Sequence, residues 1–339
     1  MTRSERLRWL EGRPALVAIA AMNAITGLVA AWVLAPLSFG ADVDFLRRGA
    51  QGFLGHYPVH DFVFTPLAAV LAVPLAWLAA PAASAAWSLV ELAILLAGVA
   101  LATRGMAALD RLLVGVAALG FLPVVNELLL GQVTMVIAAG LLPLAARDGR
   151  GRGVALGVVL ALVPKPLLIP VLVWMLLWRR RALVEALVTA AALTLAGLLV
   201  AGPDAYRWWL EALVGAAEVT RRGNLALTAL PTWAWAVGVT LTVLATGWAI
   251  VRSEPAGFVA ALLAGLLLAP YTLLYALSVL LVGVRPAARV AGRATIILAL
   301  VANVALIAAS MVWGSAALAS VAAAAARPER GSRIGTRPG

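Results

Sequence analysis

Long apolar runs separated by short polar stretches dominate the hydrophobic pattern of this chain. A membrane-spanning helix needs about 20 mostly apolar residues, and the first run, residues 15–37, has that length. The further runs that we interpret as spans are 66–81, 84–103, 112–126, 128–146, 153–178, 182–201, 231–251, 256–284 and 291–313, with one more at 314–326. The pattern therefore predicts an all-α polytopic membrane protein with about ten to twelve transmembrane helices.

Prolines interrupt two of these runs. Pro164 and Pro166 flank Lys165 within 153–178, and Pro270 falls within 256–284. A proline removes a helical hydrogen bond, and a broken helix at membrane depth is tolerated only where it is buried or lines a cavity. We therefore expect these breaks to mark a site. If each span simply crossed the membrane in turn from the N-terminus, the basic loops could not all lie on the cytoplasmic side. We therefore expect one short segment between 66 and 126 to be re-entrant, or one span boundary there to be wrong.

Composition agrees with a membrane protein. Of 339 residues, 64% are hydrophobic and 12% are charged, and the mean hydropathy is +1.02, which excludes an ordinary soluble domain. The absence of cysteine excludes disulfides, iron–sulfur clusters and thiolate metal sites. The net charge of +11 comes from arginines in short loops, which is typical of cytoplasmic loops and of contact with membrane lipids rather than with nucleic acid.

Charge also predicts the topology of a single membrane domain, residues 1–339. Residues 1–13 are basic and should form a cytoplasmic N-terminal tail of a multi-pass protein in the cytoplasmic membrane. The polar stretch 38–65 then follows the first span on the outer side. Residues 327–339 read as a disordered basic tail.

The stretch 38–65 concentrates the rare polar residues of the chain, so we expect it to be a catalytic outer loop. It holds His56, His60, Asp42, Asp44, Asp61, Arg47, Arg48 and Tyr57. A carboxylate here could take a proton from a sugar hydroxyl, as general-base catalysis requires. The alternatives are a merely solvated loop or a helix-capping role for Asp44. A metal on His56, His60 and Asp61, or a divalent cation (Mg or Mn) on the carboxylates, is a weaker hypothesis.

Polar residues within the apolar runs suggest a second part of the site. Lys165 is the only lysine in the chain, and a compact cation in a spanning segment suits a phosphate, although it could also reach the interface by snorkelling. Asn126, Glu127 and Gln132 follow Pro123 and could line a cavity or join helices by hydrogen bonds. Glu91 and Glu185 have no evident partner.

A second polar stretch, 202–224, is expected to form an interfacial helix. Its Trp208 and Trp209 fit the aromatic belt of a membrane protein, where one or two tryptophans could also line a groove for a sugar. No nucleotide-binding, metalloprotease or serine-hydrolase motif is present.

Several short motifs, in order along residues 15–185, resemble the polytopic glycosyltransferases of family 87 in the GT-C superfamily. They are Asp44-Phe45 with Gly55-x-Tyr57, Phe64-Thr65-Pro66-Leu67 leading to Pro74-Leu75, Gly131-Gln132-Val133 after Pro123, and Lys165 before the apolar run that ends in Trp178-Arg179-Arg180-Arg181. Late in the chain, where the family tends to Ser-Pro followed by Trp and His, this sequence has Ala269-Pro270-Tyr271 and then Tyr275.

The resemblance implies a GT-C-like helical bundle that moves a sugar, mannose above all, from a polyprenyl-phosphate donor to a glycolipid or glycan acceptor at the outer membrane face. It implies inversion at the sugar carbon with Asp44 as general base, although spacing leaves Asp42 as an equal choice. Lys165, with Arg47 or Arg48, would hold the donor phosphate, and Gln132 would shape the cavity. Residues expected at the acceptor or in the cavity are His56, Tyr57, His60, Asp61, Asn126, Glu127, Tyr271 and Tyr275.

Two other functions fit parts of the pattern. Broken helices around a buried Lys165 also suit a transporter or lipid flippase, but no internal repeat relates two halves of the chain. A non-catalytic membrane scaffold related to the family is the third hypothesis.

Overall fold

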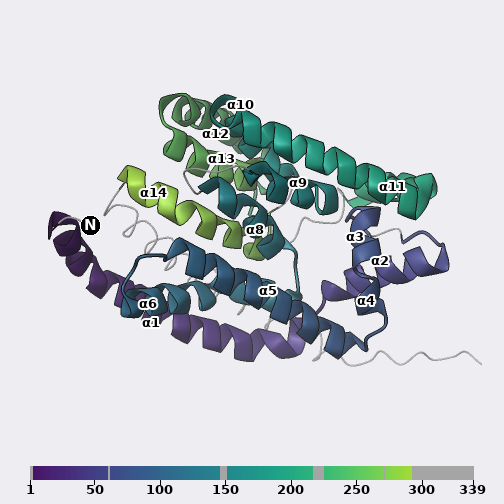
Figure 1. Ribbon diagram of the computed structural model, residues 1–339, viewed down its shortest axis with the longest axis horizontal. Coiled ribbons are helices and arrows are strands. Elements are labelled where there is room, and N and C mark those ends of the chain that lie inside the picture. Colours follow the sequence, from purple (N-terminus) through teal and green to yellow (C-terminus); the bar gives the residue numbers. More distant parts are fainter. Residues whose placement is uncertain (1–2, 60–61, 146–150, 217–224, 271, 292–339) are drawn as a thin grey trace, which may run out of the picture. The chain divides into compact units, whose positions relative to one another are not determined.

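The computed structural model describes residues 3–59, 62–145, 151–216, 225–270 and 272–291, and within these ranges the chain is helical without strands. In chain order the elements are α1 (Arg3–Ser38), α2 (Val43–Gly55), α3 (Pro66–Leu71), α4 (Val73–Ala76), α5 (Ala80–Ala102), α6 (Ala108–Leu119), α7 (Leu122–Leu130), α8 (Thr134–Ala145), α9 (Arg152–Leu162), η1 (Pro166–Leu168), α10 (Ile169–Trp178), α11 (Arg180–Ala216), η2 (Leu227–Ala229), α12 (Thr232–Arg252), α13 (Glu254–Leu268), η3 (Leu274–Gly283) and α14 (Val284–Ala291). The all-α prediction is confirmed (Figure 1).

Four helices of the described chain are long and apolar enough to cross a membrane. They are Pro14–Ala35 within α1, α5, Arg180–Leu213 within α11, and α12. The pair α6 and α7 would make a fifth span, bent by 59° at its break. Large apolar side chains on these helices stay exposed, with Trp32 at 82% and Leu199 at 79%, which suits contact with lipid. The protein is therefore a polytopic membrane protein.

Other expected spans have a different form. Residues 66–81 hold only the short helices α3 and α4, too short to cross a bilayer, so the expected irregularity between 66 and 126 begins here. The expected spans 128–146, 153–178 and 256–284 consist of shorter helices, and 291–313 and 314–326 lie outside the described residues, as does the tail 327–339. The expected ten to twelve spans are thus not reached within the part described.

The polar stretch 38–65 is not a loop throughout, because Val43–Gly55 forms α2. This helix is amphipathic: it buries Val43, Leu46 and Ala50, whereas the side chains of Asp44 and Arg48 are partly exposed. It ends at His56, whose positive φ of 55° stops the helix. Pro58 thus follows the helix end, as the sequence suggests.

Prolines and glycines cause the other breaks where the sequence predicts them. Lys165 lies in extended backbone between α9 and η1, and Pro270 lies between α13 and η3. Inside α11, Gly202 has a φ of 80° and is followed by Pro203, so the helix is broken there. The part after the break, up to Ala216, includes the expected interfacial stretch, whose remainder, 217–224, lies outside the described residues.

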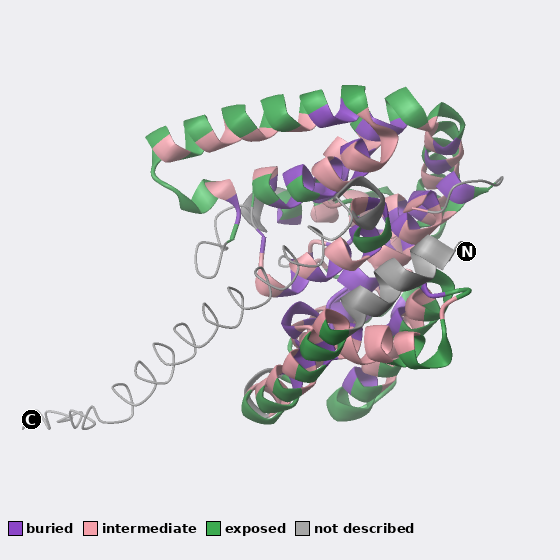
Figure 2. Cartoon of the chain, turned by 90° about the vertical axis from the view of Figure 1, so that its left-hand side faces the viewer, coloured by how far each residue is buried: buried purple, intermediate pink, exposed green. Residues whose placement is uncertain are grey.

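The helices pack in two sets that α8 joins. Helices α1, α5, α6 and α7 contact one another, and α9 to α13 form the second set, while α8 contacts α5, α9 and η3. Small residues allow close approach: a side chain at Gly120 of α6 would lie 2.3 Å from the carbonyl oxygen of Asn23 in α1. Trp174 packs on Phe258 in the core of the second set. Buried residues face the neighbouring helices and exposed ones the outside (Figure 2).

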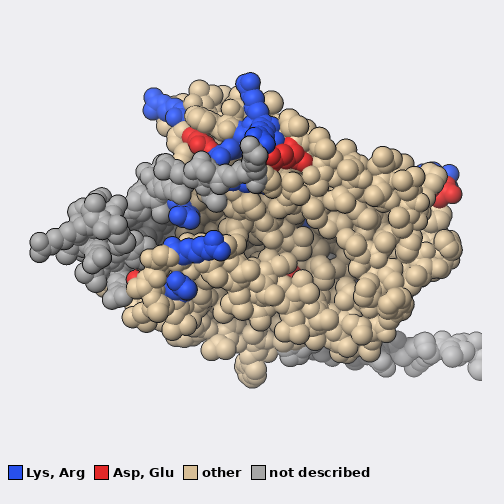
Figure 3. Space-filling model, viewed as in Figure 1, with Lys and Arg blue, Asp and Glu red and all other residues tan. Residues whose placement is uncertain are grey.

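Several charged side chains form ion pairs near the ends of helices. Arg179 at the end of α10 contacts Glu254 at the start of α13 at 2.5 Å, and Trp178 Nε1 donates to the Ile250 carbonyl at 2.6 Å. Glu185 gains the partners that the sequence did not reveal, because it accepts from the Gly153 N–H and pairs with Arg181. Most of the surface seen in Figure 3 carries no charge, as expected for a surface that contacts lipid.

Candidate functional site

The connection between α1 and α2 is fastened to the end of α7. The Gly40 N–H donates to the Leu129 carbonyl at 2.7 Å, and the Asp42 N–H donates to the Leu130 carbonyl at 2.9 Å. Because these carbonyls belong to the last turn of α7, they have no partner within their own helix. The two hydrogen bonds therefore place Asp42 beside the turn that follows α7.

That turn contains Gly131 and Gln132. Gly131 ends α7 with a φ of 75°, and a Cβ there would lie 2.1 Å from Val43 Cγ2, so only glycine fits. Trp87 Nε1 of α5 donates to the Gln132 carbonyl at 3.1 Å. With its backbone held in this way, Gln132 donates a hydrogen bond from Nε2 to Asp42 Oδ2.

The Asp42 carboxyl lies in an environment suited to proton transfer. Burial raises the pKa of Asp42, while the hydrogen bond from Gln132 and the charge of Lys165 partly oppose that rise. A carboxyl group that is half-buried and near a cation can accept a proton and still be reached by a ligand.

Lys165 is brought to this group from the break between α9 and η1. Its Nζ lies 5.7 Å from the centre of the Tyr275 ring in η3, and its charge acts on both Asp42 and Glu127. The side chain is half-buried and lines a small cavity of about 30 Å³ with Thr134, Thr272 and Tyr275 among the lining residues. The structure thus brings together Lys165 and Tyr275, which the sequence proposed separately.

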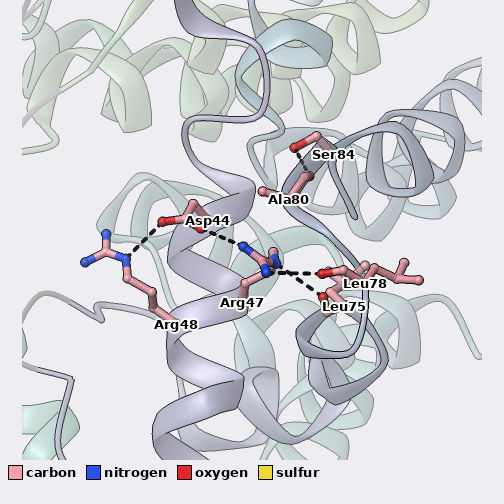
Figure 4. Close-up of polar contacts among 7 residues, drawn as sticks. All are labelled: Asp44, Arg47, Arg48, Leu75, Leu78, Ala80 and Ser84. Carbon is pink, nitrogen blue, oxygen red and sulfur yellow. Dashed lines mark hydrogen bonds and ion pairs between the residues drawn. The ribbon is translucent and has the colours of Figure 1, made fainter. Parts of the chain in front are cut away.

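Asp44, Arg47 and Arg48 form a different group (Figure 4). Asp44 pairs with Arg47 at 3.0 Å and with Arg48 at 3.3 Å, and its side chain is 47% exposed. Arg47 also donates to the carbonyl of Leu75 in α4 and to that of Leu78 between α4 and α5. The two aspartates that the sequence left as equal choices therefore have different partners in the structure. Arg47 and Arg48 both form ion pairs with Asp44, so they do not extend the cation of Lys165.

The remaining candidates lie elsewhere or outside the described residues. His56 and Tyr57 are exposed just after α2, and Asn126 is half-buried on α7. His60, Asp61 and Tyr271 lie outside the described residues. Within the ranges described, no three His, Asp or Glu side chains come close enough together to hold a metal ion.

An aromatic cleft of about 50 Å³ is a feature that the sequence indicated only through its tryptophans. Tyr57, Phe53 and Phe62 line it from one side, and Trp208 and Trp209 of α11 from the other. Trp209 Nε1 donates to the Val63 carbonyl at 3.1 Å, which fixes α11 against this segment. Gly49 and Gly52, three residues apart on one face of α2, leave room for the aromatic rings. This glycine spacing is the feature of the sequence that could have indicated the cleft.

Comparison with known proteins identifies related chains. The model of glycosyltransferase family 87 matches residues 62–275. This range includes Gln132, Lys165 and Tyr275, while Asp42 precedes it.

Two curated relatives are both named polyprenol-phosphate-mannose-dependent alpha-(1-2)-phosphatidylinositol mannoside mannosyltransferase. The one from Mycobacterium tuberculosis is 28% identical over 279 residues, covering 68% of this chain and 65% of the relative. The one from Mycolicibacterium smegmatis is 23% identical over 234 residues, covering 57% of this chain and 52% of the relative. The chain thus spans less than two thirds of the length of these relatives. No solved structure matches it.

Proposed function

This chain belongs to glycosyltransferase family 87, and from that premise we propose that it transfers a mannosyl residue from a polyprenyl-phosphate donor to a glycolipid or glycan acceptor. The names of both relatives, which specify a polyprenol-phosphate-mannose donor and a phosphatidylinositol mannoside acceptor, support this choice of substrates. A phosphatidylinositol mannoside is therefore the first acceptor to test.

One observation carries the proposal: Lys165, the only lysine of the chain, lines a cavity together with Thr134, and Gln132, two residues before Thr134, donates a hydrogen bond to the half-buried Asp42. Asp42 takes the proton from the acceptor hydroxyl as the hydroxyl oxygen attacks the anomeric carbon. The bond from that carbon to the phosphate oxygen breaks, and its electron pair leaves with the polyprenyl phosphate. A single displacement of this kind inverts the anomeric carbon. Lys165 stabilises the negative charge that develops on the phosphate.

The ion pairs of Asp44 support Asp42 as the base. Asp44 faces two arginines, and both of its carboxylate oxygens are engaged by them. A proton on Asp44 would weaken both ion pairs. Asp42 accepts one hydrogen bond, from a neutral amide, and lies near the cation that would receive the leaving group.

The length of α11 supports a site at the outer face of the cytoplasmic membrane. Arg180 to Ala201 rises about 33 Å, enough to cross the hydrocarbon core. The basic Arg179–Arg181 cluster lies at one end of this segment, and the break at Gly202 lies at the other. Trp209, beyond the break, contacts Val63. With the basic cluster cytoplasmic, the aromatic cleft lies outside and the N-terminus inside.

The decisive experiment is transfer of radiolabelled mannose from polyprenyl-phosphate mannose to phosphatidylinositol mannoside in liposomes. We compare the wild type with Asp42→Asn and with Asp44→Asn as the matched control. We expect Asp42→Asn to lose at least about 10²-fold in turnover, as removal of a general base does. Asp44→Asn should keep most of the activity.

Three results would argue against parts of this proposal. Loss of activity in Asp44→Asn alone would make Asp44 the base. Equal activity in all three proteins would exclude both aspartates as the base. A wild type that binds the donor lipid without transferring mannose would point to another sugar, or to a transporter or scaffold.

A further inference from the structure

The aromatic cleft between α2 and α11 is built from side chains that the surrounding structure holds in place. Tyr57 follows the end of α2, and its N–H donates to the Gly52 carbonyl at 3.0 Å. A Cβ at Gly55 would lie 2.6 Å from Tyr57 Cε1, so the tyrosine ring packs where only a glycine leaves room for it. On the other wall, Trp209 packs edge-on against Tyr206, with 6.1 Å between the ring centres. The cleft is therefore preformed, as ligand sites usually are.

Two hydrogen-bonding groups on the walls of this cleft are left for a ligand. Within the described ranges, the Tyr57 hydroxyl and the Trp208 indole N–H have no hydrogen-bond partner in the protein. The neighbouring Trp209 differs, because its indole N–H donates to the Val63 carbonyl. Tyrosine and tryptophan each offer an apolar ring and one polar group, so these walls suit a ligand that has an apolar face and hydroxyl groups.

The part of α11 that lines the cleft lies outside the hydrocarbon core of the membrane. Arg207, next to Trp208, pairs with Asp204 at 3.3 Å and with Glu211 at 4.0 Å, and these three side chains are 61–68% exposed. Exposed charges of this kind are costly in hydrocarbon. A sugar headgroup is expected at this level, whereas an acyl or polyprenyl chain belongs deeper in the bilayer.

The cleft and Asp42 lie at different points along α2. Asp42 directly precedes the helix, whereas Gly49 and Gly52 line the cleft. Seven residues of α-helix rise about 10 Å, so Asp42 and Gly49 are farther apart than the length of one pyranose ring. The sugar whose hydroxyl meets Asp42 is therefore not the sugar that the cleft would take.

We propose that this cleft binds a second sugar ring of the acceptor headgroup, separate from the ring whose hydroxyl reacts, an inference that rests on the proposed function. The C–H face of this pyranose stacks on the aromatic walls, and its hydroxyl groups form hydrogen bonds with Tyr57 and Trp208. The site thereby favours acceptors whose headgroup contains more than one sugar.

Direct binding of a free oligosaccharide tests the cleft without turnover. The full chain in lipid nanodiscs is mixed with α-linked mannotriose, and saturation-transfer NMR measures its Kd. We expect wild type to bind, and Trp208→Leu to bind about tenfold more weakly, because it loses one aromatic contact. Trp233→Leu is the matched control and should bind as wild type does, because Trp233 is a 74% exposed tryptophan of α12 outside the cleft.

Two further variants separate ligand contact from folding. Trp208→Phe keeps a ring and should retain more affinity than Trp208→Leu. Tyr57→Phe removes only the hydroxyl of an exposed side chain, and it should weaken binding about fivefold, as loss of one hydrogen bond does.

Two binding results would overturn the inference. One is a wild type that does not bind mannotriose, or that binds it with the same Kd as Trp208→Leu and Tyr57→Phe. The other is saturation transfer to the chain of a polyprenyl phosphate that Trp208→Leu abolishes, which would assign the cleft to a lipid.

Turnover then shows whether the bound sugar belongs to the acceptor. The acceptors are phosphatidylinositol mannosides with one mannose and with several. Trp208→Leu should raise the KM for the longer acceptor about tenfold with little change in kcat, because binding common to ground state and transition state is lost. The KM for the shorter acceptor should not change. An equal rise for both acceptors would mean that Trp208 acts through the fold, and would contradict the inference.

Failure of this inference and failure of the proposed function give different results. A wild type that binds mannotriose through Trp208 but transfers no mannose would refute the proposed function and leave a sugar site. A wild type that transfers mannose equally well to both acceptors, and whose KM values Trp208→Leu does not alter, would refute the second sugar site alone.

Discussion

At the scale of single residues, the chemistry depends on which side chains face Asp42. Gln132 stabilises the ionised carboxylate by a hydrogen bond, whereas burial favours the neutral acid and raises the pKa. A general base works only when it is deprotonated. In the proposed reaction, the acid side of the pH profile of mannosyl transfer should therefore report the pKa of Asp42.

Replacing Gln132 by leucine should move this acid limb to higher pH. The hydrogen bond from Gln132 lowers the pKa of Asp42, so the pKa rises when this bond is lost. The measurement is kcat/KM for mannosyl transfer across the acidic and neutral range. Gln51→Leu, which changes an exposed glutamine of α2, should leave the profile unchanged. If the acid limb of the pH profile has the same position in Gln132→Leu as in wild type, then the titration of Asp42 does not determine that limb.

At the scale of helices and turns, the site exists because several elements end at one place. Asp42 precedes α2, Gln132 follows α7, Thr134 begins α8 and Lys165 follows α9. Each helix end leaves backbone N–H or C=O groups without partners in their own helix, and groups from neighbouring segments form hydrogen bonds with them. The turn at Gly131 is closely packed, because a Cβ there would lie 2.1 Å from Val43 Cγ2.

Gly131→Ala should therefore destabilise the protein more than Gly105→Ala does. Both glycines have positive φ, 75° and 84°, so an alanine at either position is strained by about 1 kcal/mol or more. A Cβ at Gly131 would also clash with Val43. A Cβ at Gly105 would have no atom within 4 Å. Thermal unfolding in detergent measures the difference, and equal melting temperatures would mean that the α1–α2 connection shifts without cost.

At the scale of the whole molecule, the proposed function requires that the candidate site be open to the outer side of the membrane. The chain has no cysteine, so a single introduced cysteine is free of background labelling. Gln51 is exposed on α2, and the Arg181 side chain is 73% exposed at the other end of the spanning part of α11.

We expect an impermeant thiol reagent to label Gln51→Cys in intact cells. Arg181→Cys should be labelled only after the cells are made permeable, because the positive-inside rule places its cluster in the cytoplasm. Mannosyl transfer by each variant confirms that the labelled protein is folded. The opposite labelling pattern would invert the topology and place the candidate site on the cytoplasmic side.

The sequence by itself determined the class of the protein and the location of its main breaks. Hydropathy is a local property, so it predicted the spans that correspond to α1, α5, α11 and α12. Proline acts on its own helix, so the breaks at Lys165 and Pro270 were also visible. Hydropathy does not distinguish lipid from protein as the surroundings of an apolar helix, which is why 66–81 was wrongly read as a span.

Only the tertiary structure decided which polar residues work together. Asp42 and Asp44 are two positions apart, about 200° around a helix, so one can face Gln132 while the other faces Arg47 and Arg48. Which one faces inward depends on how the α1–α2 connection hydrogen-bonds to the end of α7. The approach of Lys165 to the Tyr275 ring depends likewise on packing between elements far apart in the chain. No spacing within the sequence encodes that contact.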